Sequence, residues 1–245
     1  MDDCVKVSRE GPVTHITLNR TDKLNAFNVE LVDQAYAAVM DAHSNGTRLA
    51  VISGAGKGFS GGFDLDGIDA ESDGDMLLRF VRVEQLLQAV YHAPFATLSL
   101  AHGACYGAAA DLISVCHHRV AAPGARFRMP GPKFDVVLGT RRLTNLVGAD
   151  RARTLILRER PFDHDEALAA GYVQEIAEQA KWPDIIASNL ERALGFSPTV
   201  QQAINARTAQ DTREADMAAL VHSVTNGSIT QRLKAYLEAV KSARR

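Results

Sequence analysis

Two loops of small residues are the stretches of this sequence best suited to chemistry. The first covers residues 54–65 and directly follows the apolar residues 49–53, which are typical of a buried strand. The second covers residues 106–112. Glycine and alanine leave backbone N–H groups accessible, and two such groups aimed at one oxygen form an oxyanion hole. The loops therefore predict a site that stabilises negative charge on an oxygen, although tight turns and close packing are an alternative explanation for the glycines.

The elements around these loops alternate between strand and helix patterns. Residues 5–10 and 13–18 alternate around a Gly-Pro pair, which predicts a β-hairpin. Asn28 is expected to cap a helix, and apolar residues recur at helical spacing over residues 76–90. Short strands are expected at 96–100, 119–122 and 126–128. This alternation favours an α/β core with short parallel strands.

The second half of the chain has a helical pattern from Gly139 onward. Asp163 and Glu166 have the spacing of a capping box, and Ser197 precedes a proline as at a helix start. A last helix is expected near residues 228–241. The core is therefore expected to carry a C-terminal helical extension.

Composition limits the partners and the compartment. The chain has 245 residues, with 27 Lys and Arg against 29 Asp and Glu, so its net charge favours neither nucleic acid nor an anionic membrane. No apolar run reaches the length of a membrane span, and the first residues lack the apolar segment of a secretory signal. Three cysteines without metal-binding spacing fit reduced thiols. We expect a cytoplasmic protein.

Three blocks of sequence resemble the crotonase superfamily, also called the enoyl-CoA hydratase/isomerase family. They are residues 18–27 (LNRTDKLNAF), 58–65 (GFSGGFDL) and 102–112 (HGACYGAAADL). The resemblance implies an α/β fold built as a spiral of ββα repeats, with a core at 1–190 and a helical trimerisation region at 191–245. It also implies trimers or dimers of trimers that act on acyl-CoA thioesters. Coenzyme A then arrives with the substrate, and no permanent cofactor or metal is expected.

The resemblance assigns catalytic roles within the two loops. The backbone N–H groups of Gly61 and Ala108 are expected to stabilise the thioester oxygen when it becomes negatively charged. Asp111 lies three residues after Ala108, so on a helix its carboxylate would sit near the acyl α and β carbons and transfer protons. An acidic residue in a first helical turn also stabilises the helix, which is the alternative role of Asp111.

The resemblance also assigns residues to coenzyme A. The segment around Lys23 matches one that wraps the nucleotide end of coenzyme A in similar proteins, and Lys23 would pair with a phosphate; a solvated lysine is the alternative. Tyr236 would reach coenzyme A from the last helix of a neighbouring subunit. The complete set of expected coenzyme A contacts is Lys23, Leu24, Ala26, Ser60, Phe63, Asp64 and Tyr236.

The sequence departs from the family pattern at its second carboxylate. Hydratases of the family carry a second Glu where this chain has Gly131, and Asp135 is the nearby acidic residue that could replace it. Hydration uses two carboxylates, whereas moving a double bond needs only one proton carrier. The expected function is therefore an enoyl-CoA hydratase/isomerase-type enzyme in which Asp111 is the acid and base, with isomerisation favoured over hydration.

Two other functions are compatible with parts of the sequence. Gly131 leaves open a diverged or non-catalytic acyl-CoA-binding protein. Residues 56–61 match G-x-G-x-x-G after a strand, the pattern of a dinucleotide-binding oxidoreductase. That match is poor, because no acidic residue follows at the expected distance.

Overall fold

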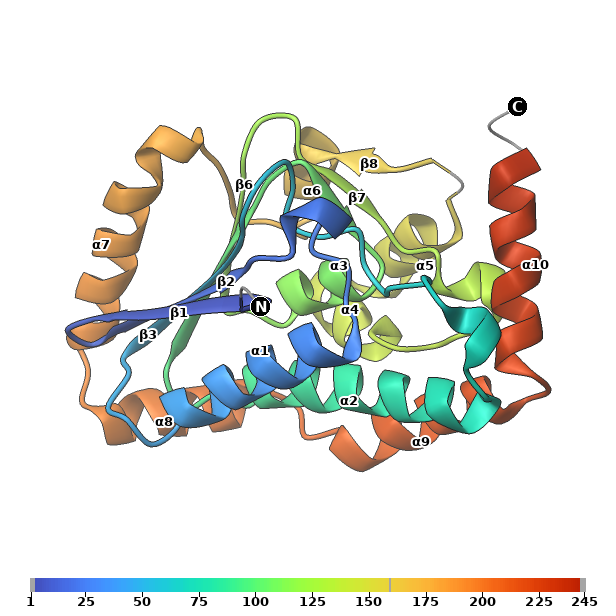
Figure 1. Cartoon of the computed structure of the whole chain (residues 1–245). Coiled ribbons are helices and arrows are strands. Elements are labelled where there is room, and N and C mark those ends of the chain that lie inside the picture. Colours follow the sequence, from blue (N-terminus) through green and yellow to red (C-terminus); the bar gives the residue numbers. More distant parts are fainter. Residues whose placement is uncertain (1–2, 159, 243–245) are drawn as a thin grey trace.

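A computed structural model describes residues 3–158 and 160–242 of the chain, and the predicted α/β fold is confirmed (Figure 1). A six-stranded sheet has the order β1-β2-β3-β4-β6-β9. The β1–β2 pair is antiparallel, as expected for the hairpin, and every later pair in this sheet is parallel. The strands are β1 (Val5–Glu10), β2 (Val13–Leu18), β3 (Leu49–Gly54), β4 (Ala96–Ala101), β6 (His118–Ala121) and β9 (Glu175–Ile176).

A second, three-stranded sheet has the order β5-β7-β8. The pair β5–β7 is parallel, and β8 runs antiparallel to β7. These strands are β5 (Ala104–Tyr106), β7 (Arg126–Arg128) and β8 (Phe162–Asp163). The two strands β8 and β9 interrupt the region expected to be wholly helical, and each consists of only two residues. So short a strand has no period of its own, which is why the sequence pattern did not predict it.

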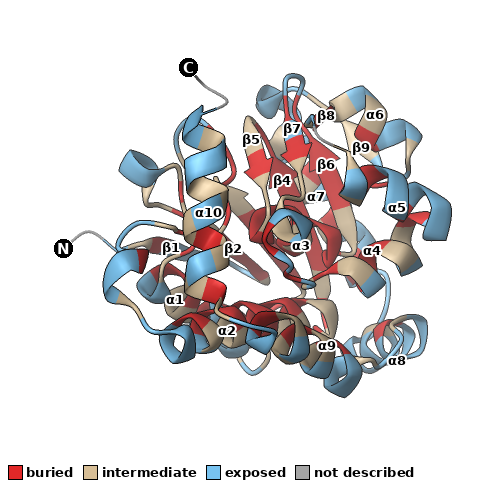
Figure 2. Ribbon diagram, turned by 90° about the vertical axis from the view of Figure 1, so that its right-hand side faces the viewer, coloured by how far each residue is buried: buried red, intermediate tan, exposed pale blue. Residues whose placement is uncertain are grey.

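Two long helices lie side by side below the large sheet in Figure 1, with α1 next to the strands and α2 next to α1. Helix α1 (Val29–Ala42) begins at Asn28, whose side chain accepts a hydrogen bond from the Leu31 N–H, as predicted. Helix α2 (Asp73–Tyr91) begins at a capping box formed by Ser72 and Asp75. The apolar face of α1 packs on β1 and β2, whereas α2 packs mainly on α1 and on α9 (Arg213–Thr225), and the polar faces of both helices are exposed (Figure 2).

The two small-residue loops leave strands of the two different sheets and meet. The first follows β3 and runs to the short 3₁₀ helix η2 (Ile68–Ala70), and the second leads from β5 into α3 (Ala108–Ser114). Gly62 has a positive φ of 91°, and a Cβ there would overlap the carbonyl oxygen of Tyr106. Glycine is therefore required for the first loop to pass directly against the second.

The rest of the chain is mainly helical, and it packs partly on α2 and partly on the large sheet. The capping box at Asp163 and Glu166 and the N-cap at Ser197 are confirmed. These elements are η1 (Thr21–Lys23), η3 (Gly131–Phe134), α4 (Thr140–Val147), α5 (Ala149–Leu157), α6 (His164–Ala169), η4 (Gln179–Lys181), α7 (Trp182–Leu194), α8 (Pro198–Thr208), α9 (Arg213–Thr225) and α10 (Ile229–Ser242). The proposed division of the chain at residue 190 remains a prediction.

One arginine fixes the last helix to its own chain. Arg232 of α10 donates to the carbonyl oxygens of Phe134, Ser223 and Val224, at distances from 2.7 to 3.2 Å. These bonds hold α10 against η3 and the end of α9, at the right-hand end of the molecule in Figure 1. The helix therefore covers the region where η3 and α2 meet.

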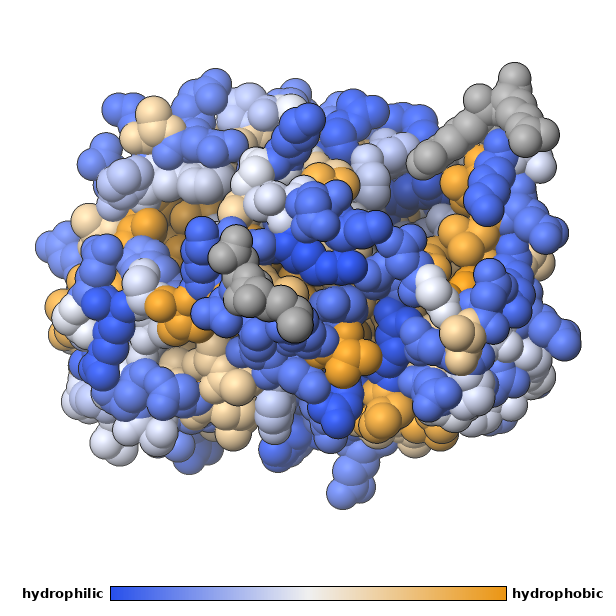
Figure 3. Space-filling view, in the orientation of Figure 1, coloured by the Kyte–Doolittle hydropathy of each residue, from blue (hydrophilic) through white to orange (hydrophobic). Residues whose placement is uncertain are grey.

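Among the described helices, none is both long and apolar enough to cross a membrane. On the face drawn in Figure 3 hydrophilic residues predominate, and hydrophobic residues show in separate patches.

Candidate active site

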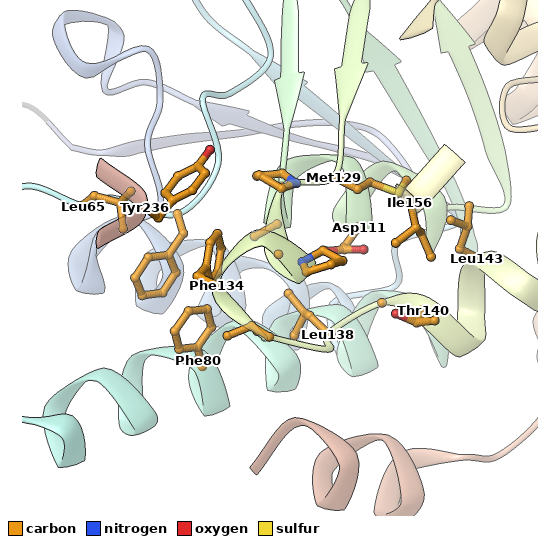
Figure 4. Close-up of a pocket in the computed structure, with 18 of the residues that line it drawn as sticks. Leu65, Phe80, Asp111, Met129, Phe134, Leu138, Thr140, Leu143, Ile156 and Tyr236 are labelled. Atoms are coloured by element: carbon orange, nitrogen blue, oxygen red, sulfur yellow. The ribbon is translucent and has the colours of Figure 1, made fainter. Parts of the chain in front are cut away.

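A cavity of about 130 Å³ lies where the two loops meet α2, η3 and α10. Figure 4 shows Asp111 near its centre, with Phe80, Phe134 and Tyr236 toward one end and Leu143 and Ile156 toward the other. Thr140 and Tyr236 supply the other polar side chains of the lining. Among the described lining residues, Asp111 is the one carboxylic acid. Among the described residues, the cavity therefore combines a mainly apolar wall with a single carboxyl group.

The first loop offers a different donor from the one expected. The Gly61 N–H donates to the carbonyl oxygen of Leu24 at 2.8 Å, so Gly61 is not available to a bound oxygen, and its predicted role as a donor does not hold. Phe63 forms a parallel bridge with Phe27, in which the Phe27 N–H donates to Gly62 O and Phe27 O accepts from the Asp64 N–H. In such a bridge the hydrogen bonds to Phe27 are made by Gly62 and Asp64, on either side of Phe63, so the N–H of Phe63 itself points away from Phe27.

Two amides of these loops, those of Phe63 and Ala108, are available as donors to a bound oxygen. Within residues 3–158 and 160–242, neither amide has a hydrogen-bond acceptor, and both residues line the cavity. Ala108 is the first residue of α3, where backbone N–H groups have no intrahelical partner. Ala108 thus retains its predicted place, whereas the donor from the first loop moves two residues from Gly61 to Phe63.

Asp111 lies on the first turn of α3 and faces the cavity. Burial raises the pKa of its carboxyl to about 7, although the Arg142 guanidinium lowers that pKa; Glu84 raises it further. A side-chain Cβ at Gly139 would overlap the Asp111 carboxylate, so the absence of a side chain at Gly139 makes room for the acid. A carboxyl with such a pKa can both accept and donate a proton at neutral pH.

A buried ion-pair network lies behind Asp111. Arg142 of α4 donates to both carboxylate oxygens of Glu84 of α2, and also to Asp216 of α9 at 3.2 Å. The Asp216 carboxylate also accepts from Arg141 at 2.7 Å and from Thr212 at 2.6 Å. Glu84 therefore belongs to an ion-pair network that joins α2, α4 and α9, and it does not line the cavity.

Among the described residues that line the cavity, none replaces the second carboxylate of the family pattern. A side-chain Cβ at Gly131 would lie 2.9 Å from the carbonyl oxygen of Val136, so the fold of η3 leaves little room for a side chain there. The Asp135 side chain is 74% exposed, and its carboxylate lies 4.0 Å from Arg232. The prediction that Asp135 reaches the site is therefore wrong, because this turn directs its side chain into solvent.

Two expected coenzyme A contacts are occupied within the chain. The Ser60 hydroxyl is buried; it donates to Asn25 O at 2.7 Å and accepts from the Gly62 N–H. The Asp64 carboxylate pairs with Arg20 and accepts from the Asp66 N–H at 3.0 Å. Both side chains therefore hold the first loop in shape and are not free to bind coenzyme A.

The Lys23 segment keeps a more open arrangement. The Lys23 ammonium pairs with Asp66 at 2.7 Å on the surface, so a phosphate would have to replace this partner. Leu24 and Ala26 are half-buried, and neither lines the cavity. Their contact with coenzyme A remains a prediction.

Tyr236 lines the cavity of its own chain. Its ring lies 5.2 Å from that of Phe134, and both rings face the cavity in Figure 4. The expectation placed this aromatic in a neighbouring subunit's site, whereas here α10 brings it to the site of the same chain. Phe63, another expected coenzyme A contact, also lines the cavity.

Sequence reasoning missed several residues that shape the site. The Asn25 side chain donates to the carbonyl oxygens of Ala55, Gly58 and Phe59, and so fixes the first loop. Gly139 and Arg142 surround Asp111 from α4. Asn25 lies within the first of the three sequence blocks, but its partners, like the neighbours of Gly139, lie more than twenty residues away along the chain.

The structure contradicts the hypothesis of a dinucleotide-binding site. Residues 56–61 follow β3, but the chain continues into the extended bridge at Phe63 and not into a helix. A dinucleotide fingerprint needs the glycines to open a helix whose N-terminus binds the pyrophosphate. Among the described residues, no cluster of three or more His, Cys, Asp or Glu side chains could hold a metal ion.

The chain is similar to a large set of known proteins. The family model described as enoyl-CoA hydratase/isomerase matches residues 8–242. A probable enoyl-CoA hydratase of Mycobacterium leprae is 34% identical over 178 residues, which cover 70% of each chain. The peroxisomal Delta(3,5)-Delta(2,4)-dienoyl-CoA isomerase of Arabidopsis thaliana is 27% identical over 190 residues, or 71% of this chain and 68% of the relative.

Solved structures give the same result. A Bordetella parapertussis protein described as an enoyl-CoA hydratase/isomerase is 41% identical, with a TM-score of 0.94 over 96% of this chain and 98% of that one. An enoyl-CoA hydratase of Bacillus halodurans shares the fold at 20% identity, with a TM-score of 0.83 over 95% of this chain and 99% of that one.

Proposed function

The chain belongs to the enoyl-CoA hydratase/isomerase family, and on this premise we propose that it isomerises a 3-enoyl-CoA thioester to the conjugated 2-enoyl-CoA. The observation that carries this proposal is the single carboxylic acid, Asp111, among the described residues that line the cavity. One acid and base suffices to move a proton between two carbons. Coenzyme A enters as part of the substrate.

In the proposed reaction, the thioester oxygen lies between the N–H groups of Phe63 and Ala108. Removing a proton next to a thioester moves electron density onto that oxygen, and donors already fixed in place stabilise it. Losing one such donor costs roughly 3 kcal/mol of transition-state stabilisation in acyl-transfer enzymes. Their position on the cavity wall beside Asp111 supports this role.

Asp111 carries the proton in both halves of the reaction. Its carboxylate removes a proton from C2; the electron pair of that C–H bond forms a C1=C2 bond, and the π pair of the carbonyl moves onto the thioester oxygen, which gives a dienolate that keeps its C3=C4 bond. The carboxylic acid then returns the proton to C4, and the double bond ends between C2 and C3. The proton is conserved, so the step needs no water and no further acid.

Hydration has less support from the site. It needs one group to activate water and another to handle the carbon proton. Gly131 provides no side chain, and Asp135 faces solvent. The name of the Arabidopsis relative, a dienoyl-CoA isomerase, agrees with isomerisation within the family.

The oligomeric state and the cellular location of the protein also belong to the proposed function. We propose a homotrimer or a dimer of trimers acting in the cytoplasm, as the family resemblance implies. Exposed apolar side chains on α7 and α8 and between them, namely Leu194, Phe196, Val200 and Ile204, support an interface with another subunit.

A product analysis tests the proposed reaction. The purified protein would be incubated with 3-hexenoyl-CoA and with crotonyl-CoA, alongside an Asp111→Asn variant, and products followed by mass and ultraviolet absorbance. We expect conversion of 3-hexenoyl-CoA without a mass change, little hydration of crotonyl-CoA, and a loss of roughly 10²- to 10⁴-fold in the variant. Binding of both thioesters without turnover would contradict the proposal and favour an acyl-CoA-binding role.

A further inference from the structure

We propose that Arg79 of α2 is a positioning residue that holds the Phe63 amide in place as an oxyanion donor. The inference rests on the proposed function, because it assigns Arg79 to the same oxyanion site. Arg79 does not line the cavity, so it acts through Phe63 and not on the substrate.

Arg79 contacts two consecutive residues of the first loop. Its guanidinium lies over the Phe63 ring, 4.4 Å from the ring centroid, and donates to the carbonyl oxygen of Asp64 at 2.5 Å. The Phe80 ring also stacks on the Phe63 ring, with the ring centroids 4.2 Å apart and 7° between the planes. The Phe63 side chain is therefore fixed by two neighbours that both come from α2.

The charge of Arg79 is buried and neutralised locally. The residue is 7% exposed, and it pairs with Glu71 at 2.6 Å. Arg20 pairs with the Asp64 carboxylate, so Asp64 is held at its side chain by Arg20 and at its main-chain carbonyl by Arg79. A planar guanidinium can stack on a ring and donate in its own plane at the same time, which a lysine ammonium cannot do.

This arrangement fixes the direction of the Phe63 N–H. An oxyanion donor works when it lies roughly 2.7–3.1 Å from the position of the charged oxygen, so a small rotation of the peptide plane weakens it. The Phe63 N–H shares its peptide plane with Gly62 O, which accepts from the Phe27 N–H, and the bond from Arg79 to Asp64 O holds the next part of the same loop. Removing Arg79 frees the second of these restraints and unstacks one face of the ring.

The test measures polarisation of a bound thioester directly. Hexa-2,4-dienoyl-CoA is a conjugated thioester whose absorbance moves to longer wavelength when its carbonyl oxygen accepts strong hydrogen bonds. We expect wild-type protein to show this red shift and an Arg79→Met variant to lose most of it. The variant's kcat should fall roughly 10- to 100-fold, since one donor is impaired, while its Kd for the dienoyl thioester changes less than about threefold.

Arg82→Met is the matched control. Arg82 lies three residues further along α2, is partly exposed, and pairs with Asp33 away from the cavity. It should keep the red shift and kcat of wild type. Arg79→Lys serves if Arg79→Met does not fold, and it should also lose most of the shift, because it loses the stacked guanidinium.

The outcomes separate this inference from the proposed function. A folded Arg79→Met or Arg79→Lys protein with the full red shift and unchanged kcat overturns the role of Arg79 alone. Absence of both red shift and turnover in wild type overturns the proposed function itself.

Discussion

Asp111 combines two properties that a proton carrier between carbons requires. It lies beside two backbone amides without acceptors in the described structure, and burial brings its pKa to about 7. An ordinary aspartate is a weak base, because its usual pKa is near 4. The apolar cavity therefore makes Asp111 a stronger base, while Arg142 limits the cost of its charge.

The pKa of Asp111 predicts the pH dependence of turnover. The carboxylate form removes the C2 proton, and a raised pKa means that this form is lost as the pH falls below about 7. We expect kcat/KM for 3-hexenoyl-CoA to rise about tenfold per pH unit below 7 and to level off above it. Rates measured from pH 5 to 9 test this, and a flat profile down to pH 5 would show that another group sets the rate.

At this scale the sequence could predict Asp111 and Ala108 but not the donor of the first loop. Asp111 and Ala108 share one helical turn, so their relation follows from local geometry. Whether Gly61 or Phe63 has a free amide depends on Leu24 and Phe27, which approach from another part of the chain. The orientation of Asp135 depends on a turn with positive φ and on Arg232 in the same way.

At the scale of elements, the junction between η3 and α4 determines how Asp111 is held. Gly139 precedes α4 with an ordinary φ of −93°, so its backbone does not require glycine. Glycine is required at this position for steric reasons, because a Cβ would overlap the Asp111 carboxylate. The start of α4 therefore forms one wall around the acid.

This packing predicts the effect of Gly139→Ala. The added methyl group should displace the Asp111 carboxylate and lower kcat by roughly 10²-fold, which is typical of small misplacements in active sites. The melting temperature should change little, since the backbone accepts alanine. Gly74→Ala is the control, because its Cβ would meet only Ser72 Oγ, at 3.6 Å, in α2. Full activity of Gly139→Ala would show that Asp111 needs no fixed position.

The sequence predicted correctly those elements whose formation depends on residues that are close together in the chain. The hairpin, the Asn28 cap and the capping box at Asp163 each depend on residues within a few positions. The strands β8 and β9 form only because β7 and β6 lie beside them, so they leave no pattern in the sequence.

At the scale of the whole molecule, the C-terminal helices complete the site of the same chain. Helix α10 brings Tyr236 to the cavity, and α9 joins the network of Glu84 and Arg142. This network connects α2, α4 and α9, which lie far apart in the sequence. Its charges are buried, so each depends on the others for compensation.

Glu84→Gln should therefore destabilise the whole fold. The substitution keeps the shape of the side chain but leaves Asp216 as the one ion-pair partner of Arg142 among the described residues, and breaking a buried pair costs roughly 3 kcal/mol or more. Urea unfolding would measure the free energy of unfolding. Asp150→Asn, which removes an exposed pair with Arg153, should leave that free energy unchanged. Equal stability of the two variants would mean that the network does not brace the molecule.

The most direct test of the central claim follows the proton itself. 3-Hexenoyl-CoA carrying deuterium at C2 would be converted in ordinary water, and the position of the label in the product determined by mass spectrometry and NMR. If Asp111 carries the proton from C2 to C4, part of the deuterium should appear at C4 in early product. Product with hydrogen from water alone at C4 would contradict direct transfer of the proton from C2 to C4 by Asp111.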